Sequence, residues 1–117
     1  MRGGEIKAVA GGPAYAGKPR PTVIVQGDSF DATESITICC FTSNARDAPL
    51  FRIEILPTER NGLRSVSSLM VDKITTVPKS KLGRHIGRLD DEDIVRLNRA
   101  MLVFLGLAAS PSSRTTQ

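Results

Sequence analysis

The chain has 117 residues, a formal net charge of +4 at pH 7 and 40% hydrophobic residues, which fits one compact domain with a modest core. No apolar run approaches the ~20 residues that span a bilayer, and Glu5 and Lys7 interrupt the N-terminal stretch that a signal peptide would need. We therefore expect a cytoplasmic protein without membrane contact, and its positive charge suits a polyanionic partner such as RNA or DNA.

The first half of the chain predicts short β-strands separated by turns. Glu5 to Ala10 can form a strand, and Gly11 to Pro19 is a glycine- and proline-rich stretch that suits either a mobile flap or a long connection. The apolar run from Thr22 to Gln26 predicts a strand with both faces covered. A turn at Gly27 to Ser29 then leads to another strand, Ser35 to Phe41.

The middle of the chain continues this pattern. A polar loop from Thr42 to Pro49 precedes Leu50 to Leu56, where apolar and charged residues alternate as in a half-buried antiparallel strand. Asn61-Gly62 is a strong turn signal. Ser67 to Val71 and Ile74 to Val77 are weaker segments, either strands or short helical pieces.

The last element is an amphipathic helix. Asp90 is a natural N-cap, the acidic residues after it favour the positive helix end, and Gly106 supplies a stop. One apolar stripe is expected to pack on the sheet rather than on a partner helix, and it comprises Ile94, Leu97, Met101, Phe104 and Leu105.

Strands first and one helix last predict an α+β, mainly β fold, with a small, strongly curved antiparallel sheet and a C-terminal α-helix. We assign residues 1–107 to one domain and residues 108–117 to a polar tail that we expect to be disordered.

The two cysteines, Cys39 and Cys40, are adjacent on a predicted strand and therefore point to opposite faces. We expect one buried and one half-exposed thiol, with no disulfide between them. A single histidine, His85, and the absence of Cys-x-x-Cys spacing argue against a zinc site, and we expect no cofactor.

An arginine stands between two prolines at the entrance of a predicted strand, in the segment Pro19-Arg20-Pro21. Proline fixes φ and biases the preceding residue toward extended geometry, so Arg20 is held in an extended backbone. In an antiparallel pair Arg20 can meet Thr42, which ends the next strand. An arginine fork matches phosphodiester oxygens, the threonine hydroxyl adds a donor, and RNA supplies its own 2′-OH nucleophile. A surface salt bridge for Arg20 and a turn position for Thr42 are the alternative.

Four stretches in order resemble the MazF/PemK endoribonuclease toxins of bacterial toxin–antitoxin systems, which share a fold with the CcdB gyrase poison. Arg2 to Ile6 (RGGEI) resembles the opening RG[DE]I strand, and Arg20 to Asp28 (RPTVIVQGD) resembles the RPxVVxQND segment. Phe41 to Asn44 (FTSN) resembles LTSN, and Leu82 to Leu89 (LGRHIGRL) resembles the closing LGxxIGxL pattern. The resemblance covers about residues 2 to 107.

This resemblance implies an SH3-like barrel, a homodimer, a small MazE-like antitoxin that occupies the RNA groove, and metal-independent cleavage of single-stranded RNA. The products would carry a 2′,3′-cyclic phosphate and a 5′-OH, and cleavage of mRNA would stop translation and growth. Arg20 takes the position of the catalytic arginine and Thr42 that of the catalytic threonine. The chain departs from the family at Lys7, where an aromatic residue is common, and at Gly27, which replaces the asparagine of QND. The candidate RNA contacts are Lys18, Gln26, Asp28, Ser43, Asn44 and Arg46.

Two other functions stay open at this point. A CcdB-like inhibitor would bind DNA gyrase through the end of the terminal helix, Met101 to Leu107, and would not need Arg20. A protein of the nuclease fold that binds RNA without cutting it is the other alternative, suggested by the departures at Lys7 and Gly27.

Overall fold

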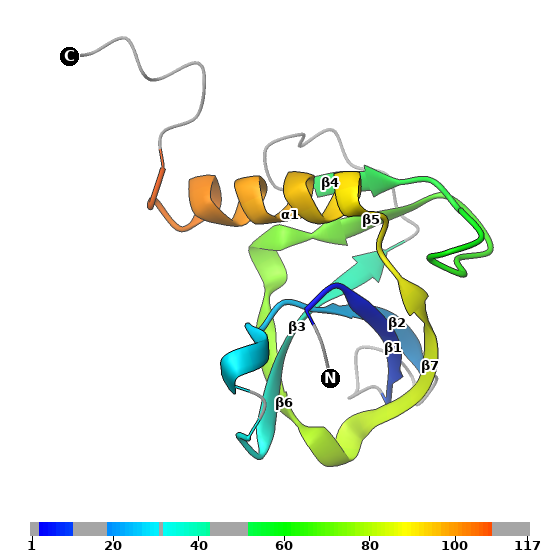
Figure 1. Cartoon of the computed structure of the whole chain (residues 1–117), viewed down its shortest axis with the longest axis vertical. Coiled ribbons are helices and arrows are strands. Elements are labelled where there is room, and N and C mark those ends of the chain that lie inside the picture. The colour runs from blue at the N-terminus through cyan, green and yellow to red at the C-terminus, as the bar shows by residue number, and fades with distance from the viewer. Residues whose placement is uncertain (1–2, 11–18, 31, 43–51, 109–117) are drawn as a thin grey trace, which may run out of the picture.

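The computed structural model describes residues 3–10, 19–30, 32–42 and 52–108. Figure 1 shows the arrangement of the strands and helices in these ranges. The strands are β1 (Glu5–Val9), β2 (Arg20–Ile24), β3 (Ser35–Thr42), β4 (Arg52–Ile55), β5 (Ser67–Met70), β6 (Thr75–Pro78) and β7 (Leu82–Arg88). The short 3-10 helices are η2 (Asp28–Phe30), η3 (Val71–Lys73) and η4 (Lys79–Lys81), and the α-helix is α1 (Asp91–Phe104).

The strands form one antiparallel sheet in the order β4-β5-β3-β2-β1-β7, and β6 pairs with the first half of β3. Strand β3 joins the two parts of the sheet, because it pairs with β2 and β6 along most of its length and with β5 at Phe41 and Thr42. The sheet curves strongly without closing (Figure 1), and α1 packs against β4 and η3. The predicted mainly β fold, a curved antiparallel sheet followed by a C-terminal helix, is confirmed.

Apolar side chains form two clusters on the two faces of the sheet. Cys39 and Phe41 of β3 belong to the larger cluster, which includes Leu97 of α1. Their neighbour Cys40 belongs to the smaller one, together with Val9 and Ile24. Because successive residues of a strand point to opposite faces, β3 is covered on both sides. This double cover explains the nearly continuous apolar sequences of β2 and β3.

The cysteines differ from the expectation of one buried and one half-exposed thiol. Cys39 is fully buried and Cys40 is only 4% exposed, and both thiols are free. The prediction for the second thiol was wrong because the smaller cluster, which the sequence pattern did not reveal, covers that face. Burial, and then the neighbouring Cys40, raises the pKa of the Cys39 thiol to about 12. Cys39 is thus a protonated core residue and a poor nucleophile at neutral pH.

The helix begins and ends where the sequence predicts. Asp90 occupies the N-cap position without a side-chain capping bond. At the other end Gly106 has φ +77°, and its N–H donates to the Val103 carbonyl at 3.1 Å, while Leu107 N–H donates to Leu102 at 2.8 Å. This pair of bonds is a Schellman motif, which needs a residue in the left-handed region.

The apolar stripe of α1 packs only over its first part. Leu97 is buried, and Ile94 and Met101 contact the larger cluster. Phe104 and Leu105 are 46% and 59% exposed, so the expectation that they belong to the core was wrong. The physical reason is length, since the last turns of the helix extend past the strands (Figure 1). No helix among the described residues is long and apolar enough to cross a membrane.

Strand β7 was not predicted as a strand. It contains two glycines and the exposed residues Arg84 and His85, so it lacks a β-forming pattern. Gly87 is buried where the loop after β4 comes close, and a side chain there would collide with the carbonyl oxygens of Arg60 and Asn61. The glycine therefore permits this close approach of two backbones.

Candidate active site

Arg20 begins β2 and Thr42 ends β3, so the two residues lie at the same end of this antiparallel strand pair. The β2–β3 register pairs Thr22 with Cys40 and Ile24 with Ile38. Continued by two residues, the same register places Arg20 opposite Thr42. Both residues therefore face the same side of the sheet as Thr22 and Cys40. Arg20 is exposed and Thr42 is half-buried, so the pair combines a solvent-accessible cation with a hydroxyl held closer to the protein.

The local sequence explains how Arg20 is presented. It is the first residue of β2, flanked by Pro19 and Pro21, and its backbone is extended as the two prolines predict. Arg20 pairs with Val9 of β1, a residue of the smaller cluster that is 2% exposed. The arginine backbone is thus fixed by a buried neighbour while its side chain reaches solvent.

Thr42 is fixed by a different strand. It is the last residue of β3 and pairs with Ser68 of β5, while its neighbour Phe41 is buried opposite Leu69. Phe41 anchors the end of β3 in the larger cluster, so Thr42 has a defined position. The site is therefore assembled from β2 on one side and from the β3–β5 pair on the other.

Lys7 adds a second positive charge to this face, although the sequence had marked it only as a departure from the family. In the β1–β2 register Lys7 lies opposite Thr22, and Val9 lies opposite Arg20. Residues two apart on a strand point to the same face, so the side chains of Lys7 and Arg20 lie on one face of the sheet. The buried Thr22 hydroxyl donates to the Lys7 carbonyl at 3.0 Å and ties the two strands together.

Gln26 and Asp28 lie beyond the opposite end of β2 from Arg20. Gln26 Nε2 donates to the Phe30 carbonyl at 2.7 Å, and its Oε1 accepts the Thr37 N–H at 3.3 Å. Asp28 Oδ1 accepts the Gly3 N–H at 2.9 Å. Five residues of strand correspond to roughly 15–17 Å, so the structure does not bring these two polar residues together with Arg20 and Thr42.

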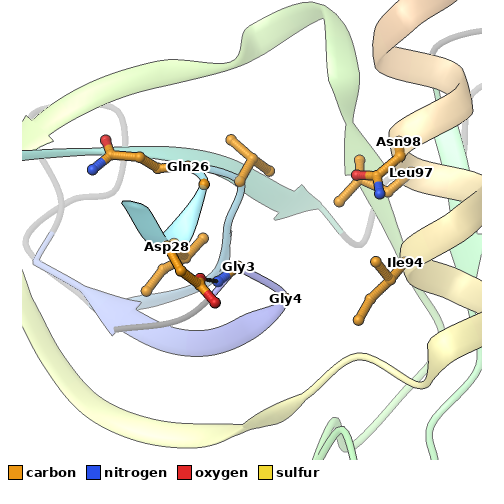
Figure 2. A pocket seen from close by; sticks show the side chains of 10 residues that line it. Gly3, Gly4, Gln26, Asp28, Ile94, Leu97 and Asn98 are labelled. Carbon is orange, nitrogen blue, oxygen red and sulfur yellow. Dashed lines mark hydrogen bonds between the residues drawn. The ribbon is translucent and has the colours of Figure 1, made fainter. Parts of the chain in front are cut away.

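Figure 2 shows the surroundings of Gln26 and Asp28. They line a pocket of about 310 Å³ between the end of β2 and helix α1, and Ile94 and Asn98 form its other wall. Asp28 lies beside Gly3, whose N–H it accepts. The other four candidate RNA contacts, Lys18, Ser43, Asn44 and Arg46, lie outside the described residues.

A buried ion pair supports the β5 side of the site and was missed from the sequence. Arg52 Nε and Nη2 each lie 3.2 Å from an oxygen of Asp72, and the Arg52 side chain is only 9% exposed. Arg52 pairs with Met70, two residues from Ser68. The sequence showed Arg52 as a solvent-facing residue of an alternating strand, and no pattern linked it to Asp72, twenty residues later.

The described part of the chain contains no group of three or more histidine, cysteine, aspartate or glutamate side chains that could hold a metal ion. His85 Nδ1 lies 3.8 Å from Glu5 Oε2. The acidic residues after Asp90 form the first turn of α1, as expected, and Asp93 there pairs with Arg96 at 2.8 Å.

Comparison with known proteins places this geometry in a family. Residues 4–105 match the family described as PemK-like, MazF-like toxin of type II toxin–antitoxin system. The chain is 56% identical over 108 residues to a probable endoribonuclease MazF from Mycolicibacterium smegmatis, and the match covers 92% of this chain and 99% of that protein. It is 30% identical to endoribonuclease MazF9 from Mycobacterium tuberculosis, with 92% and 98% covered.

A solved structure shows the same fold. It is that of an endoribonuclease in complex with its cognate antitoxin from a mycobacterial species, with a TM-score of 0.79 and 21% identity over 94% of this chain and 99% of that one. Together these matches favour the endoribonuclease interpretation over a CcdB-like gyrase inhibitor. The chain belongs to the PemK-like, MazF-like toxins of type II toxin–antitoxin systems.

Proposed function

We propose that this toxin-family endoribonuclease cleaves single-stranded RNA at the end of the β2–β3 strand pair where Arg20 and Thr42 lie. The observation that supports the proposal is the β2–β3 register, which pairs Thr22 with Cys40. Continued by two residues, that register brings the exposed Arg20 opposite the half-buried Thr42. The net charge of +4 attracts a polyanion to the molecule, and Lys7 adds charge to this face.

The proposed reaction uses the nucleophile of the RNA itself. The 2′-oxygen attacks the adjacent phosphorus and loses its proton, and the bond from phosphorus to the 5′-oxygen breaks. The products are a 2′,3′-cyclic phosphate and a 5′-oxygen that takes up a proton. Negative charge grows on the two non-bridging oxygens as the pentacovalent state forms.

Arg20 and Thr42 have separate roles in this reaction. The guanidinium of Arg20 binds the scissile phosphate and stabilises its growing charge, and it can donate the proton to the leaving 5′-oxygen. The Thr42 hydroxyl donates a second hydrogen bond to the pentacovalent state. A protonated guanidinium has no free lone pair to accept a proton, so the group that accepts the 2′-OH proton is not assigned to Arg20.

The partners follow from the family and from its solved relatives. A relative with the same fold was solved in complex with its cognate antitoxin, and we propose that a small antitoxin inhibits this chain as well. We also propose that the chain forms a homodimer, that residues 1–107 make up its toxin domain, and that it acts in the cytoplasm, where mRNA is translated. The family match to residues 4–105 supports the domain assignment.

Cleavage of a long RNA in the presence of EDTA tests the function. We expect the wild type to cut the RNA with EDTA present and to leave cyclic phosphate ends, which resist phosphatase until acid opens the ring. We expect Arg20→Ala and Thr42→Ala to reduce the cleavage rate by roughly 10²–10³, as for loss of one charge-stabilising donor. Undiminished cleavage by both variants would contradict the site assignment, and no cleavage by the wild type would contradict the function.

A further inference from the structure

A second cavity lies beside the start of β2, on the other face of the sheet from Arg20. It has a volume of about 230 Å³. Pro21 lines it, and because neighbouring residues of a strand point to opposite faces, the cavity and the Arg20 side chain flank the same strand end. The polar part of the lining comes from Arg84 of β7 and from Arg64, Ser65 and Ser67 at the entrance to β5. The rest is formed by Gly62, Leu63 and Ile86.

The two arginines of this cavity are exposed and carry uncompensated charge. Within the described ranges neither Arg64 nor Arg84 has a carboxylate partner. Four other arginines do form ion pairs with carboxylates in this structure, namely Arg52, Arg60, Arg88 and Arg96. Two positive charges that line one cavity favour the binding of an anion there.

The loop that carries Arg64 is held firmly against the strand that carries Arg84. Asn61 is fully buried, and both the oxygen and the nitrogen of its side chain form hydrogen bonds. Its Oδ1 accepts the N–H groups of Thr58 and Leu63, each at 2.9 Å. Its Nδ2 donates to the Leu56 carbonyl at 2.9 Å. The loop also meets β7 directly, through the bond from Arg88 N–H to the Arg60 carbonyl at 3.0 Å.

This docking makes the cavity a pre-formed feature of the fold. A ligand that binds there does not have to order the backbone of the loop, which lowers the entropic cost of binding. Two arginines and two serines are among the residues that line the cavity, and the planar fork of arginine matches phosphate oxygens better than any other side chain. The chemistry of the cavity is therefore that of a phosphate site.

We propose that this cavity binds a backbone phosphate of the single-stranded RNA substrate, near the phosphodiester that Arg20 holds. The proposal rests on the proposed function. RNA is favoured over an acidic protein segment because Pro21 directly follows Arg20 in the chain. An RNA strand bound at Arg20 carries further phosphates close to the cavity, and covalent connection gives those phosphates a high effective concentration.

The test measures RNA binding without cleavage. A fluorescein-labelled 2′-O-methyl RNA of about 20 random nucleotides lacks the 2′-OH nucleophile, so binding can be followed by anisotropy over a series of salt concentrations. We expect Arg64→Ala/Arg84→Ala to weaken binding by roughly tenfold or more. We also expect the slope of log K against log salt to become shallower by about 0.7 for each phosphate that the variant no longer neutralises.

The matched control is Arg99→Ala. Arg99 is an exposed arginine of α1 that lies outside the cavity and has no carboxylate partner among the described residues, so its loss changes the net charge by the same amount as one cavity substitution. We expect its slope to match that of the wild type. Arg84→Lys, which keeps the charge and loses the fork, should keep the slope and lose part of the affinity.

Three results would overturn the proposal. The first is equal weakening by Arg64→Ala, Arg84→Ala and Arg99→Ala, which would indicate only general electrostatic attraction. The second is unchanged RNA binding by the double variant together with unchanged antitoxin affinity, which would leave the cavity without a role in binding. The third is unchanged RNA binding by the double variant with a loss of antitoxin affinity, which would assign the cavity to the protein partner. The binding assay needs no cleavage, so it distinguishes failure of this proposal from failure of the proposed function. A wild type that binds RNA without cutting it would contradict the proposed function, and the binding of the variants would still test the cavity.

Discussion

The two ends of β2 both carry polar side chains, but those side chains are used differently. At the far end Gln26 and Asp28 hold the chain in place, with their side chains bonded to the backbone at Phe30 and Gly3. At the near end Arg20 is exposed, faces the side of Thr42, and has the Arg64 and Arg84 cavity behind its strand. A polar residue at a strand end is therefore weak evidence for a binding role until its bonds are known.

The strongest test of this comparison is the cleavage rate of variants at the two ends of β2. We expect Arg20→Ala to reduce cleavage by roughly 10²–10³. We expect Gln26→Ala to stay within a few-fold of the wild type once the folded fraction is taken into account, because Gln26 bonds to its own loop rather than facing Arg20. Initial rates on one RNA at several enzyme concentrations would measure both. A reduction of roughly 10² or more in Gln26→Ala, as large as that of a catalytic donor, would show that the far end also contributes to catalysis.

The second test compares the stability of the variants at the two ends of β2 instead of their cleavage rates. Gln26 makes hydrogen bonds to Phe30, Thr33 and Thr37, so Gln26→Ala should lower the free energy of unfolding by about 1–3 kcal/mol. Arg20→Ala should lower it less than Gln26→Ala does, since the Arg20 side chain is exposed. Urea unfolding followed by circular dichroism gives both values, and an equal loss in the two variants would remove the distinction.

The smallest expected effect concerns Asp28, where two variants distinguish the contribution of the carboxylate charge to stability from that of the hydrogen bond. Asp28→Ala removes the acceptor of the Gly3 N–H and should cost about 0.5–1.5 kcal/mol of stability. Asp28→Asn keeps an oxygen acceptor there and should cost nearly nothing. Urea midpoints measure both changes. If Asp28→Asn were as destabilising as Asp28→Ala, the carboxylate charge would matter more than the bond.

The sequence predicted the fold best where one local rule decided the structure. The apolar runs of β2 and β3, the turn at Asn61-Gly62 and the two ends of α1 were all recognised from residue patterns. Strand β7 was not, because its glycines are selected by contact with a distant loop, and tertiary packing overrides propensity there. The exposure of Phe104 depends on how far the sheet extends beneath the helix, which no helical periodicity can show.

The positions of the candidate site residues were predictable in part for the same reason. Arg20 and Thr42 could be placed at the same end of a strand pair because antiparallel pairing and two prolines are local signals. Their catalytic role stays a prediction. The cavity formed by Arg64 and Arg84 could not, since it depends on a loop folding back onto a strand about twenty residues further along the chain. The buried pair of Arg52 and Asp72 is likewise a tertiary contact without a sequence signature.

The division of β3 between two partners has a consequence for the way the protein would become inactive. Arg20 is held by β1, whereas Thr42 is held by Ser68 of the β4–β5 hairpin. Opening of that hairpin would release one half of the site. Because Ile53, Ile55 and Leu69 of the hairpin belong to the larger cluster, the same opening would expose core side chains. In rising denaturant the enzyme would therefore become inactive at the point where the larger cluster melts, and the position of Thr42 would be only as stable as that cluster.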